Sequence, residues 1–161
     1  MTENRYKLNK PKTATIIIML LIAATLAFIW GNSLESVAES SEKSSRVLES
    51  LAFVLEPVFG KANVTDHLVR KLAHFTEFGL LGIWLALFIA VHGRARLQSV
   101  ANCLFFGLSV AVSDEALQLL SGRGSQVTDV LLDFAGAASG IFAVLVVRWS
   151  VLRIKKGSER K

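Results

Sequence analysis

Two short polar clusters interrupt an otherwise apolar chain, and they contain the residues whose chemistry could be functional. The first cluster spans residues 70–77 and includes Arg70, His74 and Glu77. The second spans residues 114–133 and includes Asp114, Glu115, Gln118, Arg123, Asp129 and Asp133. Ionisable groups are costly inside membrane spans, so they are functional candidates by default, and pairing with one another is the usual structural reason for their presence.

The spacing of the first cluster places its polar groups on one face of a helix, because residues three and four apart are neighbours on a helix surface. Arg70, His74 and Glu77 follow this spacing. Each residue rises about 1.5 Å along a helix, so Glu77 is expected roughly 10 Å deeper than Arg70.

The second cluster repeats this spacing on two further helices. Asp114 and Gln118 are one turn apart, and so are Asp129 and Asp133. In lipid each polar group needs a polar partner or water, so we expect the clusters to converge at one depth. Small residues at positions 136 and 140 continue the aspartate stripe and predict close helix packing.

Two interpretations of the convergence remain open. In one, the clusters form a structural network in which Arg70 and Arg123 neutralise carboxylates and Gln118 bridges them. In the other, they line a water-accessible pocket. Five carboxylates against one His and two Arg leave negative charge uncompensated, which calls for a cation, protonated carboxyls or a cationic ligand, and this favours the pocket.

The residue types suggest a role for each group. Acid–base chemistry by His74 with a carboxylate predicts a catalytic set: His74, Glu77, Asp114, Glu115 and Asp129. Binding of a ligand is assigned to Arg70, Gln118, Arg123 and Asp133. No cofactor is identified, but a divalent metal fits His74, Asp114, Glu115 and Asp129.

The elements that must position these residues are membrane helices. The chain has 161 residues, 52% of them hydrophobic, and a mean hydropathy of +0.49. Its apolar runs are long enough to cross a hydrocarbon core of about 30 Å, and they lie at 13–30, 68–91, 98–120 and 129–149. We therefore predict an all-α, polytopic bundle of four transmembrane helices over residues 13–150, between basic tails at 1–12 and 151–161. A cleaved signal peptide is the alternative for the first run, but its length and the three later runs favour a signal anchor.

The connection at 31–67 is expected to lie outside the membrane on the extracytoplasmic side. Its first part is rich in Ser and Glu and predicts a loop. Apolar residues then recur at helical spacing over about 44–56, which predicts an amphipathic surface helix that ends at Pro57. Thr65 or Asp66 is expected to cap the next helix.

Charge predicts the orientation. Of the 18 Lys and Arg residues, 12 lie before the first run, in the turn at 93–97 or from Arg148 onwards, whereas 31–67 is rich in acids. The positive-inside rule therefore places both termini in the cytoplasm and the polar clusters on the other side. The net charge of +5 is explained in this way, and no nucleic-acid-binding module is present. The lone Cys103 excludes an internal disulfide.

At the polar clusters the sequence resembles the VanZ-like family of small bacterial membrane proteins, whose founding members are linked to low-level teicoplanin resistance. The matching segments are 70–78 (RKLAHFTEF), 113–118 (SDEALQ), 122–124 (GRG) and 129–136 (DVLLDFAG), with Gly140 and Asn32-Ser33-Leu34. Asp133 stands where many members carry Asn, and Glu77 is followed directly by Phe78. The resemblance covers about residues 13–150 and implies a role in the cell envelope, at the bacterial cytoplasmic membrane.

Three functions remain as hypotheses. The first is a pocket that binds or processes a lipid-linked or glycopeptide-related ligand, such as a cell-wall intermediate, and contributes to teicoplanin-type resistance. The second is an ion- or proton-coupled transporter, for which four spans without a visible repeat would need a homo-oligomer. The third is a structural or regulatory subunit whose polar network fixes helix packing. Membrane lipids are expected partners in every case, and whether the protein is an enzyme stays open.

Overall fold

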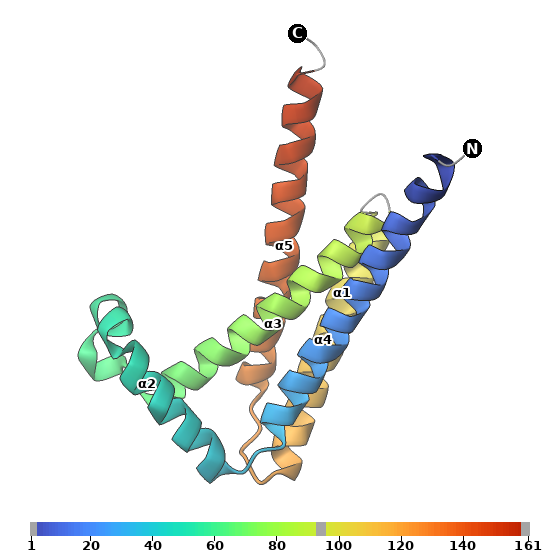
Figure 1. The fold of residues 1–161 in the computed structure, drawn as a ribbon. Coiled ribbons are helices and arrows are strands. Elements are labelled where there is room, and N and C mark those ends of the chain that lie inside the picture. The colour runs from blue at the N-terminus through green and yellow to red at the C-terminus, as the bar shows by residue number, and fades with distance from the viewer. Residues whose placement is uncertain (1–2, 93–95, 159–161) are drawn as a thin grey trace.

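The computed structural model describes residues 3–92 and 96–158, with side chains from residue 12 onwards, and every regular element in these ranges is a helix (Figure 1). In chain order the elements are α1 (Glu3–Ser33), α2 (Val37–Phe59), the short 3₁₀ turn η1 (Lys61–Asn63), α3 (Asp66–Val91), α4 (Leu97–Leu120) and α5 (Val127–Ser158). The predicted all-α class is confirmed.

Four of these helices are long and apolar enough to cross a membrane, as the four apolar runs predicted. The candidate spans are Lys12–Ser33, Asp66–Val91, Leu97–Leu120 and Val127–Ser158. At the start of α3, the Thr65 hydroxyl accepts a hydrogen bond from the Leu68 backbone N–H at 3.3 Å, so the expected cap is Thr65. The chain is therefore a helical membrane protein.

The helices extend into the basic segments that were expected as tails at 1–12 and 151–161. α1 begins at Glu3, and α5 continues to Ser158. In α5 the Arg153 guanidinium lies 4.1 Å from the centre of the Trp149 ring. Lys155 and Lys156 lie in the last turn of α5, where their positive charges interact favourably with the helix macrodipole. Arg94, Arg160 and Lys161 lie outside the described residues.

The Ser- and Glu-rich segment expected as a loop is mostly helical. α2 begins at Val37 because Ser36 and Glu39 form a capping box, in which each side chain accepts from the other residue's backbone N–H. The hydrogen bonds from Ser36 hold the pKa of Glu39 below its ordinary value. Pro57 lies inside the last turn of α2 and does not end it; Gly60, with a φ of 79°, follows the helix. The predicted amphipathic helix is present but begins before residue 44.

α3 is the central helix and packs against all four of the others, most extensively against α5. It crosses α5, while α1 and α4 run side by side (Figure 1). The described ends of α1 and α5 nearest the two termini lie toward one end of the molecule, and the α4–α5 loop lies at the opposite end (Figure 1). That opposite end, where α1 and α4 finish and α3 and α5 begin, is called the polar end below.

Glycines allow α3 and α5 to approach closely, as the small residues at positions 136 and 140 predicted. A Cβ on Gly136 would overlap the Phe75 carbonyl, and one on Gly140 would overlap the Gly79 carbonyl. Backbone contact of this kind requires residues without a side chain. The rotation of α5 against α3 is therefore fixed, and with it the direction in which the aspartates of α5 point.

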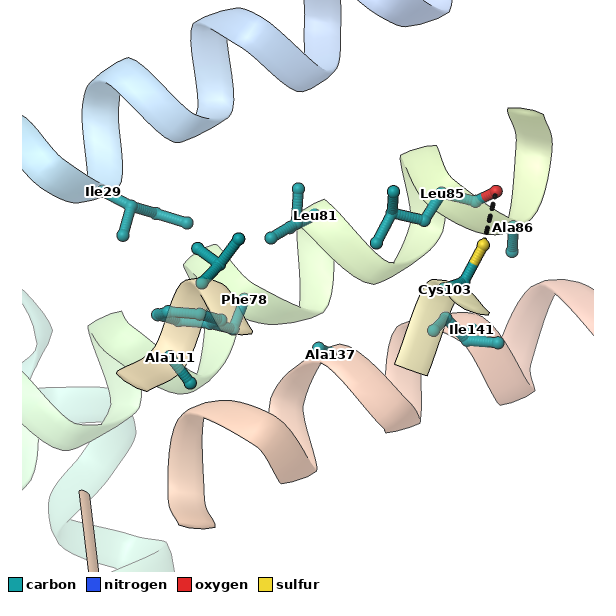
Figure 2. Close-up of a cluster of buried hydrophobic side chains, with 10 residues drawn as sticks. Ile29, Phe78, Leu81, Leu85, Ala86, Cys103, Ala111, Ala137 and Ile141 are labelled. Carbon is teal, nitrogen blue, oxygen red and sulfur yellow. Dashed lines mark hydrogen bonds between the residues drawn. The ribbon is translucent and has the colours of Figure 1, made fainter. Parts of the chain in front are cut away.

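An apolar core lies between α1, α3, α4 and α5 (Figure 2). It joins Ile29 of α1, Phe78 and Leu81 of α3, and Ile141 of α5 with residues of α4. Many large apolar side chains face outward instead, among them Leu20, Phe105, Leu131 and Phe142. This distribution suits a protein whose surroundings are apolar, because lipid does not penalise exposed hydrocarbon.

Candidate functional site

The polar clusters converge at the polar end, as their spacing predicted. α3 provides Arg70, His74 and Glu77, α4 provides Asp114, Glu115 and Gln118, the α4–α5 loop provides Arg123, and α5 provides Asp129 and Asp133. All of them except Asp114 line a cavity at this end, and Asp114 lies directly behind His74.

Asp114 is the most enclosed carboxylate of the site. Its residue is fully buried, one carboxylate oxygen accepts from the Ser33 hydroxyl at the end of α1, and the other accepts from the Gln118 amide at 2.8 Å. The expected contact between Asp114 and Gln118, one turn apart, is therefore confirmed. Two donors fix the orientation of this carboxylate, which presents its Oδ2 to His74 at 3.7 Å from Nδ1.

His74 lies between two aspartates of different helices. Its Nδ1 atom is 4.0 Å from Oδ1 of Asp133, which is also buried. Neither Nδ1 of His74 nor this oxygen has a hydrogen-bond partner among the described residues. Buried polar groups are nearly always paired, so this gap marks the place where a ligand, an ion or water would bind.

Glu115 and Asp129 have partners of their own, away from His74. Glu115 is buried and accepts from the backbone N–H of Gln126 at 3.0 Å, which holds the α4–α5 loop against α4. The Lys71 ammonium lies 3.0 Å from Oδ1 of Asp129. The expected metal set is therefore assembled only in part.

The one group of potential metal ligands among the described residues is His74, Asp114 and Asp133. The predicted metal ligands also included Glu115 and Asp129, but the third ligand in the structure is Asp133 instead. Successive residues on a helix point about 100° apart, so Asp114 and its neighbour Glu115 cannot face the same partner.

The α4–α5 loop holds Arg123 over the site through a glycine turn. Gly122 has a φ of 78°, and the Arg123 N–H donates to the Gln118 carbonyl at 2.9 Å, which is the hydrogen-bond pattern of a glycine-capped helix end. The guanidinium donates to the Asn32 carbonyl at the end of α1 at 3.0 Å. Burial and the nearby Arg70 lower the pKa of Arg123, but a guanidinium stays charged.

The remaining predicted residues lie around this centre. The Arg70 guanidinium donates to the Ser41 hydroxyl of α2 at 3.3 Å, and Glu77 accepts from the Asn32 side-chain amide at 3.1 Å. Arg70, Glu77, Glu115 and Arg123 each keep one buried side-chain N or O atom without a hydrogen-bond partner in the described part of the chain.

Three cavities meet around these groups. A cavity of about 250 Å³ is lined mostly by charged and polar side chains, among them Arg70, His74 and Arg123. A second, of about 290 Å³, shares these three residues and extends to Phe28 and Glu77. A third, of about 410 Å³, begins at Phe28 and Glu77 and is otherwise almost entirely apolar, since Leu21, Ala24, Thr25, Thr76, Leu80 and Trp84 line the rest of it between α1 and α3.

Three site residues were missed by the assignment from the sequence. Asn32 and Ser33 hold Glu77, Arg123 and Asp114 from the end of α1, and Lys71 pairs with Asp129. The sequence features that could have indicated them are the polar pair Asn32-Ser33, just after the first apolar run, and the basic residue Lys71 next to Arg70. Lys71 also changes the charge balance, because five carboxylates then face three cations.

Comparison with known protein families identifies the family of the chain. A family model described as VanZ/LLP1 matches residues 15–148, which includes every residue of the site. Neither the curated proteins nor the solved structures compared with the chain match it.

Proposed function

The chain belongs to the VanZ/LLP1 family, and on this premise we propose that it binds an amphiphile with an anionic headgroup, such as a lipid-linked cell-wall intermediate, in the bacterial cytoplasmic membrane. The headgroup occupies the charged cavity at the polar end, which faces the extracytoplasmic side. The apolar chain of the lipid lies in the groove between α1 and α3.

The observation that carries this proposal is the series of three cavities. They share lining residues in sequence, Arg70, His74 and Arg123 between the first two, and Phe28 and Glu77 between the last two. Their lining changes from charged to apolar in the same order. An amphiphile has this distribution of polarity, and a lipid can enter such a groove sideways from the bilayer.

Cavity size supports a headgroup as the polar ligand. Typical small-molecule sites measure about 300–1,000 Å³, and the charged cavity, at about 250 Å³, lies just below this range. A phosphate or diphosphate fits this space, whereas a whole glycopeptide does not. Of the two ligand classes that the sequence suggested, the geometry therefore favours the lipid-linked one.

The two arginines are placed to hold the anion. Arg70 and Arg123 line both cavities nearest the site, and each has a buried Nε without a hydrogen-bond partner in the described part of the chain. The planar guanidinium suits phosphate oxygens. His74 lines the same two cavities as the arginines. On the basis of the family resemblance, the proposal includes that this protein contributes to teicoplanin-type resistance.

Lipid binding by the purified full-length protein tests the proposal. Native mass spectrometry with a polyprenyl phosphate should show a bound lipid, and the polyprenol with the same chain should bind more weakly. Arg70→Gln should weaken phosphate binding about 10- to 100-fold, since a hydrogen bond to a charged group contributes about 1.5–3 kcal/mol.

Arg46→Gln is the matched control, because Arg46 is an exposed arginine that pairs with Glu42 on α2 and lines none of the three cavities. It should bind the lipid as the wild type does. Equal binding of alcohol and phosphate, or of Arg70→Gln and wild type, would contradict the proposal and leave the polar cluster as a packing element.

A further inference from the structure

Three potential metal ligands from three different helices point at one another at the polar end. A ring nitrogen of His74 on α3, a carboxylate oxygen of Asp114 on α4 and one of Asp133 on α5 all lie within 4.8 Å of one another. Nδ1 of His74 is 3.7 Å from Asp114 and 4.0 Å from Asp133.

These separations are too long for hydrogen bonds and close to those of ligands that share an ion. N–H···O hydrogen bonds measure about 2.7–3.2 Å. Zinc binds nitrogen and carboxylate oxygen at about 2.0–2.2 Å, so two ligands at a tetrahedral angle lie about 3.4 Å apart. The two His74–aspartate separations exceed this value by only about 0.3 and 0.6 Å.

A second observation points to a ligand at the same place. The Asp133 side chain is only 2% exposed, yet its Oδ1 atom and the facing Nδ1 of His74 have no hydrogen-bond partner among the described residues. A buried carboxylate without a partner is costly. Both residues also line the charged cavity, and the two facing atoms are buried in its wall.

The nearby cations have other contacts. Lys71 lies against Asp129, Arg123 donates to the Asn32 carbonyl, and Arg70 donates to Ser41. Two buried aspartates therefore face a single imidazole. A divalent cation would neutralise two carboxylates while leaving the imidazole neutral, which is the form that binds metals.

Asp114 already has the supporting contacts that metal-binding carboxylates have. The Ser33 hydroxyl and the Gln118 amide each donate to one of its oxygens and fix its plane. Partners of this kind orient the ligand, and their loss typically lowers metal affinity 10- to 100-fold.

We propose that Nδ1 of His74, Oδ2 of Asp114 and Oδ1 of Asp133 bind a divalent cation of the zinc or manganese class, whose remaining positions face the charged cavity. One imidazole and two carboxylates suit these ions. The ion would also attract a phosphate into a cavity rich in carboxylates. That last role rests on the proposed function, whereas the site itself rests on its own geometry.

Zinc binding by the full-length protein, freed of any polyhistidine tag and of metal, tests the inference. Calorimetry with Zn²⁺ alone, without lipid, should give one ion per chain. Asp133→Asn and His74→Gln should each weaken binding at least about 100-fold, more than the loss of an outer contact.

Asp129→Asn is the matched control, because it removes a carboxylate from the same cavity but not from the three ligands. It should retain zinc affinity within about fivefold. Equal losses in Asp129→Asn and Asp133→Asn would overturn the assignment in favour of a diffuse charge effect, and so would a wild type that binds no zinc at millimolar concentration.

X-ray absorption of the zinc-loaded wild type gives a test that depends on no variant's folding. The expected spectrum has one imidazole and otherwise oxygen ligands, and a spectrum without imidazole would overturn the assignment. Because zinc is added without lipid, failure here leaves phosphate-lipid binding untouched. Failure of lipid binding likewise leaves the zinc result standing.

Discussion

At the scale of single residues, Asp114 joins three helices at the polar end. It is fully buried on α4, accepts from Ser33 of α1 and from Gln118 of its own helix, and faces His74 of α3. Removing one donor from a buried carboxylate leaves an oxygen without compensation. The position of His74 and of the cavity wall depends on these contacts, so the end of α1 is part of the site although it carries no charge.

Ser33→Ala tests this connection. We expect it to lower the free energy of unfolding by about 1–3 kcal/mol, because Asp114 loses one of its two donors. Denaturant titration in mixed micelles would measure the loss. Ser109→Ala serves as the control, since the Ser109 hydroxyl donates, within the described part of the chain, only to the carbonyl of Phe105 in its own helix; it should change stability by less than about 0.5 kcal/mol. Equal effects would mean that the Ser33 contact adds nothing.

At the scale of elements, the pair α3 and α5 determines which polar groups meet. Their backbones touch where glycines replace side chains, at Gly79 and Gly82 on α3 and at Gly136 and Gly140 on α5. Close contact fixes the rotation of α5 and directs Asp133, one turn before residue 136, toward His74. The glycine stripe thus positions the site and does not merely pack the bundle.

Gly136→Ala should disturb this arrangement. Its Cβ would overlap the Phe75 carbonyl, so the helices must separate, and we expect a loss of about 1–3 kcal/mol in unfolding free energy. Zinc affinity should fall with it, because Asp133 would move away from His74.

Gly31→Ala is the control for the glycine prediction. Nothing lies within 4 Å of the position its Cβ would take, so alanine should be neutral or stabilising by up to about 1 kcal/mol. Thermal melts of both variants in one detergent would decide the matter. A Gly136→Ala protein as stable as Gly31→Ala would show that α5 is free to shift.

At the scale of the whole molecule, the two ends of the bundle differ in charge. The described ends of α1 and α5 nearest the termini lie toward one end, and the α4–α5 loop lies at the other (Figure 1). The cavity with its charged lining lies beside that loop. The basic residues near the termini favour the cytoplasmic side. A pocket that opens on the other side can meet lipid-linked molecules that carry their headgroups outside the cell.

Cysteine labelling in intact cells tests the orientation. Cys103 is the only cysteine, so a Cys103→Ser background can receive Ser125→Cys in the exposed α4–α5 loop or Lys156→Cys near the end of α5. A membrane-impermeant maleimide should label position 125 from outside and position 156 only after the membrane is permeabilised. The reverse pattern would place the cavity in the cytoplasm and remove extracytoplasmic lipids from the proposal.

Much of the molecule could be predicted from the sequence, because its determinants are local. The length and polarity of the apolar runs specify four helices that can cross a membrane, and helical spacing places Arg70, His74 and Glu77 along one helix. The start of α2 is also encoded locally, in the capping box of Ser36 and Glu39. The prediction of a loop there was wrong because it rested on the polar composition of the segment, whereas the capping box indicates the start of a helix.

Tertiary structure alone decided which partners these residues meet. The aspartate that faces His74 from α5 is Asp133, whereas Asp129 meets Lys71 and Glu115 meets the α4–α5 loop. Helical spacing gives the relative directions of residues on one helix, but not the rotation of that helix against its neighbours. Backbone contact at the α3–α5 glycines sets that rotation. The sequence by itself therefore determined the helices and the charged residues that they carry. Packing between the helices decided which of these residues meet, and it brought His74, Asp114 and Asp133 together as a candidate metal site.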